Sequence, residues 1–540
     1  MPFDFSVICA NANEGFYFAN GELLLSGRKL YLDVFQSRGP LFFLFYAALV
    51  KIFGFGTYAI IAAHIIHKIV IVLAGVALYL LTNELLSSKF FAGLAVLFLV
   101  LLLLTPIGQW GALAEFESNL GLEAEYFSVV FSLFALYFLA ISCKGIKTIF
   151  FSIMGGVLTV CSMMFKANGA ILAIAVFVWI LYIFLFDREA FKELKRTIIF
   201  FMSGLVFTLL IFIVGIYLHT NDLGRFFDVY FFTGNYNNEA INSIQNFLML
   251  ILRFMLRYCL SLNNFLLFLF TFMFFGWSLV RKYFIKTNTS ILRAFIPLLS
   301  LCGIGNCCVV MAPGFNAYGS YYYLLVWPFV AIALTFSLKE IFTYATKPGL
   351  AIFKIGITII FIILFAERIY ITFPGYFKLA KINILLNPVF QAESFQDPVV
   401  YSQNINERRR FLFFADVINS FLPDKNDKIY IFNDFTNANP LLSANIYIYT
   451  KRGSASSIFS NWFYLEKFFS KTMPLLIKDL STVKPKIIIV PCNPNLQLWT
   501  AKPLAPYFRF FDLFLKENYH LISTLKYESE DKSYDVFERK

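Results

Sequence analysis

Charged side chains and histidine are scarce in this chain of 540 residues. Asp, Glu, Lys and Arg together make up 14% of it, and there are four histidines. Soluble proteins carry about 25% charged residues. Hydrophobic residues reach 59%, with 69 phenylalanines, and the mean hydropathy is +0.71. The shortage of charge excludes a wholly soluble protein, and the composition predicts an integral membrane protein.

Several other features are missing. The sequence has no glycine-rich phosphate loop, no internal repeat and no low-complexity tract. Of its eight cysteines, only Cys492 lies in the C-terminal tail, so a disulfide framework is excluded there. No signal peptide or apolar segment precedes the first polar stretch. We therefore expect the natural product to have one further N-terminal span, or an earlier start.

Long apolar segments dominate the middle of the chain. A transmembrane helix needs about 20 mainly apolar residues, and ten segments approach or reach this length. Residues 246–258 instead have the pattern of an amphipathic surface helix. The predicted spans are 57–83, 89–105, 125–142, 148–165, 168–186, 197–218, 259–281, 293–312, 321–338 and 350–367.

The basic residues predict the orientation, because Lys and Arg accumulate in short cytoplasmic loops. One alternating set of loops after the first span is rich in them, whereas the other set holds only Lys166 and Arg225. The second set, residues 1–56 and the tail 368–540 therefore face outward. We expect a multi-pass protein of the bacterial cytoplasmic (inner) membrane. Much of the net charge of +12 follows from this orientation, so no nucleic-acid partner is expected.

Three regions follow: a first outer loop at 1–56, a multi-span domain at 57–367 and an extracytoplasmic domain at 368–540. In the last region the long apolar runs end. Short β-branched and aromatic runs predict strands, and longer stretches with helical spacing lie between and after them. This alternation favours a small α/β domain. The expected strands are 428–434, 445–450 and 484–491, and the expected helices are 458–480 and 504–518.

Carboxylates on the outward side are candidates for acid and base chemistry. Glu14 and Asp33 lie in the first loop, and Glu125 opens a long apolar helix, where the helix dipole also favours an acid. Such a group acts as a general base when a substrate hydroxyl is within hydrogen-bond reach. Lysine inside a span is costly, so Lys68 is a functional candidate or a residue that extends to the headgroups. Lys166 either contacts an anion or marks a short outer turn.

The first loop resembles a known family. NEG-x-Y (13–17), LLLSG (23–27), Y-x-D (31–33) and RGP (38–40), followed by KIFGFG, resemble the first outer loop of GT-C fold glycosyltransferases that use polyprenyl-phosphate sugars. Aminoarabinose transferases and protein O-mannosyltransferases belong to this group. The resemblance extends through EAEYF (123–127), FKANG (165–169) and GSYYYLLVWP (319–328) to YIYTKRGSAS (447–456).

The resemblance implies transfer of one sugar from a polyprenyl-phosphate donor to a glycan, lipid or protein acceptor, alongside membrane lipids. Arg38 matches the family's basic residue before proline and would bind the lipid phosphate, with Lys68 and Lys166 in support. Where the family has Asp-Glu, this chain has Asn13 and Glu14. Either Glu14 is the base, or Glu125 is, or the chain is inactive. Asp33 would bind sugar hydroxyls or hold the loop. Tyr17 and Tyr31 would flank the sugar or anchor the loop at the interface.

Alternatives to this interpretation stay open. His64 and His67 lie three residues apart beside Lys68, which suggests a metal site. However, no motif in the sequence enforces ligand geometry. No cofactor is firmly predicted, although a divalent cation bridging an acid and the donor phosphate is compatible with the sequence. A secondary transporter would also be polytopic, yet neither paired repeats nor broken helices are evident. A glycan ligase or polymerase with a diphosphate carrier is the nearest alternative enzyme.

Overall fold

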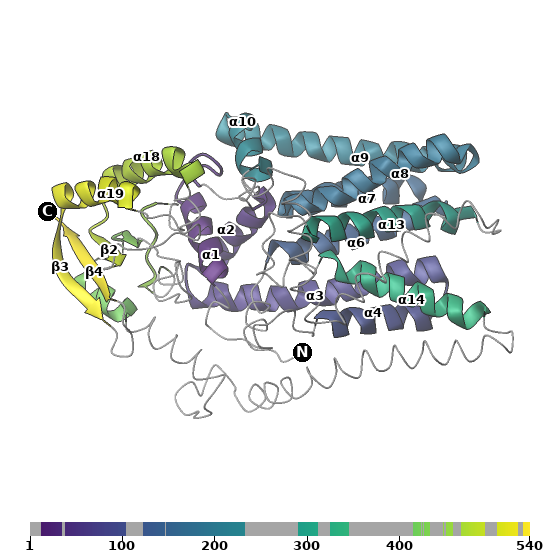
Figure 1. The fold of residues 1–540 in the computed structure, drawn as a ribbon, viewed down its shortest axis with the longest axis horizontal. Helices are drawn as coiled ribbons and strands as arrows, with labels where there is room; N and C mark the ends of the chain where they lie inside the picture. Colours follow the sequence, from purple (N-terminus) through teal and green to yellow (C-terminus); the bar gives the residue numbers. More distant parts are fainter. Residues whose placement is uncertain are drawn as a thin grey trace, which may run out of the picture. The chain divides into compact units, whose positions relative to one another are not determined.

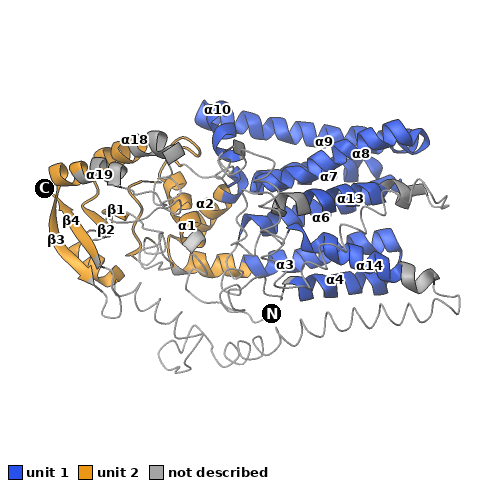
Figure 2. Ribbon diagram, viewed as in Figure 1, with its two compact units in different colours: residues 1–4, 37–42, 66–387 blue, residues 5–36, 43–65, 388–540 orange. Residues whose placement is uncertain are grey.

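The chain forms two compact units, which Figure 2 distinguishes by colour. Unit 1 comprises residues 1–4, 37–42 and 66–387, and unit 2 comprises residues 5–36, 43–65 and 388–540. The computed structural model describes residues 12–34, 38–103, 123–145, 147–232, 290–311, 325–344, 414–422, 424, 426–431, 447, 450–456, 466–491, 505–526 and 533–540.

Unit 1 is built from helices. Among them α6 packs on α7, α7 on α9, α8 on α13 and α4 on α14 (Figure 1). The elements are α4 (Lys89–Leu103), α6 (Ala124–Cys143), α7 (Thr148–Phe165), η1 (Ala167–Gly169), α8 (Ala170–Phe186), α9 (Arg188–Thr220), α10 (Leu223–Phe227), η2 (Asp228–Phe232), α13 (Ser290–Met311), α14 (Trp327–Tyr344) and most of α3 (Thr57–Leu86).

Glycine permits the closest of these helix contacts. A Cβ atom on Gly156 of α7 would lie 2.2 Å from the carbonyl oxygen of Phe201 in α9. On the facing helix, a Cβ atom on Gly204 would lie 2.4 Å from the carbonyl oxygen of Ile153. Small residues at such points let the backbones of membrane helices approach each other.

The outer faces of the helices are apolar. In α8 and α9, large side chains such as Phe177, Phe184, Phe207 and Leu210 are exposed. Five helices among the described residues are long and apolar enough to cross a membrane: α3, α6, α7, α9 and the continuous η1–α8 segment. Apolar side chains pointing outward along helices of this length fit a lipid environment, and the chain is a polytopic helical membrane protein.

Helices lie where most of the apolar segments predict them. The predictions for α3, α4, α6, α7, α8 and α13 agree with the structure to within a few residues. However, α9 begins at Arg188 rather than 197, because its charged first turns also form helix; the Asp187 side chain accepts a hydrogen bond from the Ala190 amide (3.2 Å). Helix α14 (predicted 321–338) spans Trp327–Tyr344, and residues 321–324 lie outside the described residues. The predicted segments 246–258, 259–281 and 350–367 lie outside the described residues.

Unit 2 contains a four-stranded sheet in the order β1-β2-β4-β3. Strand β1 runs parallel to β2, and β4 pairs with β2 and β3 in antiparallel fashion. Helices α18 and α19 pack on each other, and α19 contacts β3. The bounds are β1 (Ile429–Ile431), α18 (Glu466–Val483), β2 (Ile487–Pro491), α19 (Ala505–Asn518), β3 (Tyr519–Lys526) and β4 (Ser533–Arg539).

The prediction of a strand at 445–450 is wrong at the positions described. Tyr447 and Thr450 are helical. Tyr447 is buried, and its hydroxyl accepts a hydrogen bond from the Ile431 amide (3.0 Å). Side-chain packing beside β1 thus outweighs the β propensity of the aromatic run. Strands β3 and β4 were not predicted from the sequence.

The first loop is largely helical in unit 2. Helix α1 (Ala12–Leu25) packs on α2 (Pro40–Phe53), and a Cβ atom on Gly21 would lie 2.9 Å from the Ala47 nitrogen. Pro40 is a favoured first helical residue, because it has no amide hydrogen to satisfy and its φ suits a helix. Residues 13–34 of the polar stretch therefore form a helix followed by a turn rather than an irregular loop.

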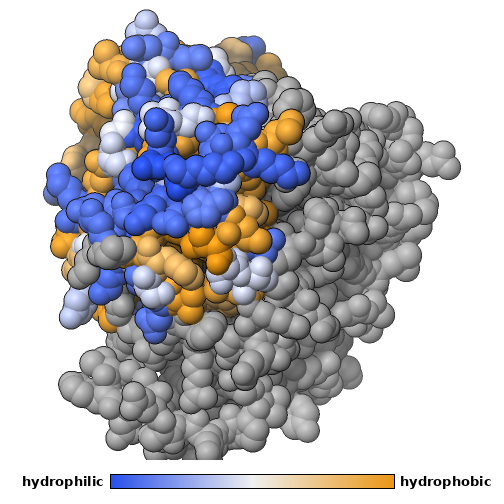
Figure 3. Space-filling model, turned by 90° about the vertical axis from the view of Figure 1, so that its left-hand side faces the viewer, coloured by the Kyte–Doolittle hydropathy of each residue, from blue (hydrophilic) through white to orange (hydrophobic). Residues whose placement is uncertain are grey.

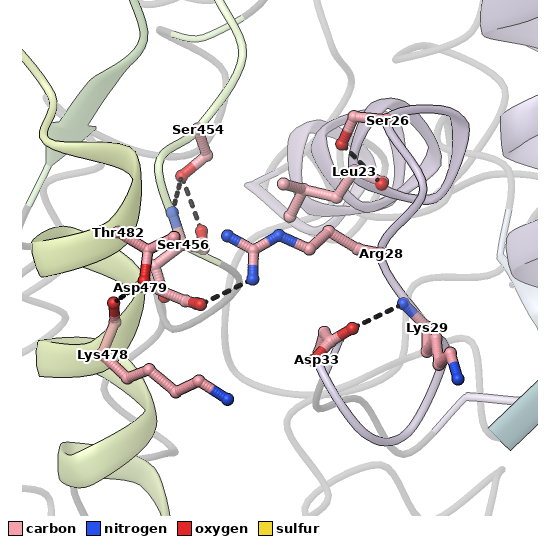
Figure 4. Close-up of polar contacts among 10 residues, drawn as sticks. All are labelled: Leu23, Ser26, Arg28, Lys29, Asp33, Ser454, Ser456, Lys478, Asp479 and Thr482. Atoms are coloured by element: carbon pink, nitrogen blue, oxygen red, sulfur yellow. Dashed lines mark hydrogen bonds and ion pairs between the residues drawn. The ribbon is translucent and has the colours of Figure 1, made fainter. Parts of the chain in front are cut away.

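An ion pair ties this turn to α18. Arg28 Nη1 lies 2.7 Å from Asp479 Oδ1, and the Ser456 hydroxyl donates to the other oxygen of Asp479 (2.8 Å), as Figure 4 shows for the residues around it. Burial raises the pKa of Asp479, and Ser456 and Arg28 oppose this rise. The contact joins residues separated by more than 400 positions, and it holds the chain leaving α1 against the α/β part of unit 2.

The face in Figure 3 is largely hydrophilic where the structure describes it, with smaller apolar areas between the polar side chains. Exposed residues of unit 2 include Lys478, Lys484, Lys516 and Arg539. This surface differs from the apolar flanks of α8 and α9, and it suits contact with water.

Candidate functional site

Arg38 and Gly39 lie against the turn that follows α7. The Gly39 amide donates to the Phe165 carbonyl (3.2 Å). A Cβ atom on Gly39 would lie 1.9 Å from the Met164 carbonyl oxygen, so a larger residue does not fit without moving the backbone. Glycine therefore allows the RGP segment to touch the end of α7, one residue before Lys166. Two of the predicted basic residues are brought to the same part of unit 1.

Lys166 forms a buried ion pair with Glu125. Its Nζ atom lies 2.7 Å from Glu125 Oε1, and both side chains are almost completely shielded from solvent. Apart from this ion pair, neither oxygen of Glu125 has a hydrogen-bond partner among the described residues. Separating a buried pair is costly because it leaves an uncompensated charge. The short turn at Lys166 and the acid at the start of α6 are thus parts of one cluster.

Serine hydrogen bonds hold α6 and α7 together near this pair. The Ser128 and Ser162 hydroxyls are 2.8 Å apart, and Ser162 also donates to the Ser128 carbonyl (2.9 Å). Ser132 reaches the same Ser162 hydroxyl at 2.8 Å. Because Glu125 lies one turn before Ser128 and Lys166 one turn after Ser162, these bonds set the register in which acid and lysine meet.

Tyr230 is a member of this cluster that the sequence did not reveal. It lies in η2, is almost completely buried, and its hydroxyl donates to the Met163 carbonyl. Burial raises the pKa of Tyr230 well above its ordinary value; the negative charge of Glu125 raises it further, and the positive charge of Arg38 opposes the rise. The only signal in the sequence was a tyrosine in an outer loop, which is common at membrane interfaces.

Charge in this cluster favours a bound anion. Two cations, Arg38 and Lys166, accompany one carboxylate, Glu125, with the Tyr230 hydroxyl beside them. These four residues, called the cationic cluster, therefore carry a net positive charge among themselves. The guanidinium group of Arg38 can bind two phosphate oxygens at once.

In unit 2, Glu14 meets a histidine. Glu14 Oε2 lies 3.1 Å from His64 Nε2, and the two side chains are 1% and 4% exposed. Glu14 lies in the first turn of α1. Helix α3 carries His64. Three residues later His67, which belongs to unit 1, packs its ring against Tyr126 of the same unit, 4.3 Å between ring centroids. The two histidines therefore have different partners.

The structure also places the remaining candidate residues. The Asp33 carboxylate accepts a hydrogen bond from the Lys29 amide (2.9 Å). Tyr31 is buried in the same turn with φ of 66°. Tyr17 is buried against Tyr46, 5.2 Å between ring centroids. Lys68 is half-buried within α3. No group of three metal-binding side chains occurs in the part of the chain that the structure describes.

Known proteins resemble this chain in fold rather than in sequence. No protein-family model and no curated protein sequence matches the chain. It is similar to the apo structure of ArnT, an aminoarabinose transferase from Cupriavidus metallidurans, with a TM-score of 0.52 and 12% identity over 97% of this chain and 93% of that one. The same protein bound to undecaprenyl phosphate gives a TM-score of 0.51 and 11% identity with the same coverage.

An oligosaccharyltransferase from Archaeoglobus fulgidus gives a TM-score of 0.47 and 12% identity over 89% of this chain and 66% of that one. The likeness to ArnT over nearly the whole length of both chains shows a shared fold. It confirms the resemblance to GT-C fold proteins that the first-loop motifs predicted.

Proposed function

We propose that this protein is a membrane glycosyltransferase that moves one sugar from a polyprenyl-phosphate donor to an acceptor of the cell envelope. The observation that carries the proposal is the cationic cluster, in which the partly exposed Arg38 accompanies the buried Lys166, Glu125 and Tyr230, on a fold shared with ArnT. An ArnT structure holds undecaprenyl phosphate, and we extend a ligand of that class to this chain. The setting would be the bacterial inner membrane, with unit 2 carrying an extracytoplasmic α/β domain.

The cationic cluster would bind the phosphate of the donor. As the bond between the sugar and the phosphate breaks, the phosphate gains negative charge. A fixed cation about 4 Å away contributes on the order of 4 kcal/mol at an effective dielectric constant near 20, before desolvation costs. Arg38 would contact the phosphate oxygens, Lys166 and the Tyr230 hydroxyl would support it, and Glu125 would hold Lys166 in place. Lys68 remains a proposed additional contact.

Glu14 would be the general base. The acceptor hydroxyl gives its proton to the Glu14 carboxylate, its oxygen forms the new bond to the anomeric carbon, and the carbon–phosphate oxygen bond breaks to release polyprenyl phosphate. A positioned base of this kind contributes about 10²–10⁴-fold to rate. The pairing of Glu125 with Lys166 supports this choice, because a carboxylate held by an ammonium group is engaged in an ion pair. Asn13 cannot serve as the base, because its side chain is an amide rather than a carboxylate.

We propose three classes of acceptor, in order of preference. Lipid A or lipopolysaccharide comes first, then another envelope glycan, then a protein hydroxyl. All three offer a nucleophilic group at the outer membrane surface, and the base and the anion site would serve each alike. The sugar, too, depends on pocket contacts rather than on this charged machinery.

The experiment compares three otherwise identical strains: one with the native gene, one with a deletion, and one with Glu14→Gln at equal membrane abundance. Mass spectrometry of lipid A, core glycan and envelope proteins would identify the modified fraction. Loss of the same monosaccharide mass in the deletion and in Glu14→Gln would support the transferase and the base. Unchanged masses in every fraction would contradict the proposal, and loss in the deletion alone would move the base to Glu125.

A further inference from the structure

We propose that His64 is the positioning residue for Glu14, because a hydrogen bond donated by Nε2–H orients the carboxylate. The inference rests on the proposed function, since it adds a role to the base of that reaction. It assigns a function to a histidine that the sequence suggested only as part of a metal pair. In this assignment His64 touches neither donor nor acceptor.

Burial makes such a partner necessary. Glu14 is wholly inaccessible to solvent, and His64 is 3% exposed. An ionised carboxylate removed from water is destabilised by several kcal/mol unless charged or hydrogen-bonded partners compensate it. The 3.1 Å contact between Oε2 and Nε2 supplies a charge-assisted hydrogen bond. Without it, the buried carboxylate of Glu14 would lose one of the hydrogen bonds that compensate for its burial.

Histidine suits this position better than lysine would. A neutral imidazole with its proton on Nε2 would orient the carboxylate through a hydrogen bond without itself adding a positive charge. Lysine would bind the carboxylate as a permanent ion pair, as Lys166 binds Glu125 at 2.7 Å. The different partners of Glu14 and Glu125 therefore suit the two carboxylates to different roles.

The fold holds both side chains firmly. His64 is buried within the 30-residue helix α3, and Glu14 lies in α1, which packs on α2 with backbone atoms close to Gly21. A base and its partner on helices keep their geometry better than the same groups on a loop. The dyad of Glu14 and His64 is thus built into the helical part of unit 2.

The test uses the full-length protein in lipid nanodiscs with the donor and acceptor identified by mass spectrometry. His64→Leu removes the hydrogen bond, and His64→Gln keeps a donor of similar reach. We expect kcat to fall about 100-fold in His64→Leu with the donor KM unchanged, and to recover to within about tenfold of wild type in His64→Gln. His67→Leu is the matched control, a buried histidine of the same helix, and should retain wild-type kcat.

The outcomes distinguish the role of His64 from the proposed function. A wild-type protein without transferase activity overturns the proposed function itself. If the wild type is active and His64→Leu matches it in kcat, the role of His64 is overturned while the transferase stands. Failure of His64→Gln to recover, with both variants folded by size exclusion and thermal unfolding, also overturns it, because hydrogen bonding would not be what the residue supplies. A rise in donor KM without a fall in kcat would overturn it too, and make His64 a binding residue.

Discussion

Glu14 and Glu125 lie in corresponding places in two regions of the molecule, and each contacts a different basic side chain. Each is in the first turn of a helix, α1 in unit 2 and α6 in unit 1, and each is completely buried. Glu14 faces the imidazole of His64, whereas Glu125 faces the ammonium group of Lys166. Burial alone therefore does not tell which acid does chemistry.

The partner decides the task of each acid. A buried carboxylate beside lysine forms an ion pair whose separation is costly, so it is suited to holding the lysine in place. A buried carboxylate beside histidine keeps a partner that can donate a hydrogen bond in its neutral form. We therefore expect Glu125 to act through structure and binding, and Glu14 through the chemical step.

Removing each acid in turn gives the largest expected effect. Glu14→Gln should lower kcat about 1,000-fold with the donor KM unchanged, because the base acts only as the reaction proceeds. Glu125→Gln should raise the donor KM and change kcat by less than about tenfold. Steady-state kinetics on folded, detergent-purified protein measure both. The reverse pattern would exchange the roles of the two acids.

Replacing Lys166 tests whether its ion pair with Glu125 stabilises the fold. Lys166→Met leaves the Glu125 carboxylate buried without its cation, and should lower the free energy of unfolding by about 3–5 kcal/mol. The double variant Lys166→Met/Glu125→Gln should recover most of this loss in thermal unfolding, yet not recover donor binding. If the single variant is as stable as wild type, the pair does not stabilise the fold.

Asp479 is a third acid for this comparison. It is paired with Arg28, and neither residue has a role in the proposed reaction. Arg28→Ala should lower the free energy of unfolding by about 1–3 kcal/mol at neutral pH. Arg28 lowers the pKa of Asp479 against the rise caused by burial. Its contribution is therefore present while Asp479 is ionised, and is lost as the pH falls toward the ordinary value of 3.8.

Unfolding of wild type and Arg28→Ala across this pH range would show the difference shrink with acidification. Lys29→Ala is the control, because it removes an equal charge from an exposed neighbour. A difference that stays constant with pH would mean that Arg28 stabilises by packing. Loss of kcat comparable to that of Glu14→Gln would give Asp479 or Arg28 a part in the reaction.

The smallest effect concerns the approach of the RGP segment to the α7 turn. Gly39→Ala should weaken undecaprenyl phosphate binding about tenfold, near 1.4 kcal/mol, because the new Cβ atom displaces Arg38 from the cationic cluster. Gly56→Ala, where a Cβ atom meets nothing within 4 Å, should bind as wild type does. Binding in nanodiscs by isothermal titration would measure both, and equal affinities would contradict this role of Gly39.

Much of the helical part could be predicted because apolar length has a direct physical meaning in a membrane. Residues 148–165 were predicted as a span and form helix α7 with the same bounds. Prediction failed where polar or aromatic residues depend on tertiary contacts. The first turns of α9 are charged and capped by Asp187, and the aromatic run at 445–450 is helical where described, with Tyr447 packed beside β1.

For the candidate site, the sequence proposed residue types but not their pairings. The sequence identified Glu14, Glu125, Arg38 and Lys166 as candidates, yet offered no reason to join Glu14 to His64 or Lys166 to Glu125. The partners are 50 and 41 positions apart in the chain. Tyr230 had no distinguishing signal, because a tyrosine near a membrane surface is common.

Composition and local pattern were enough to specify the class of protein, the positions of most apolar helices and the chemical types at the candidate site. Apolar segments and charged residues impose these through their transfer energies between water and lipid, which depend on composition over short windows. Which buried carboxylate meets lysine and which meets histidine was settled by the folded chain. That choice depends on helix packing, on close approaches such as Gly39 to the α7 turn, and on contacts between residues distant in the sequence.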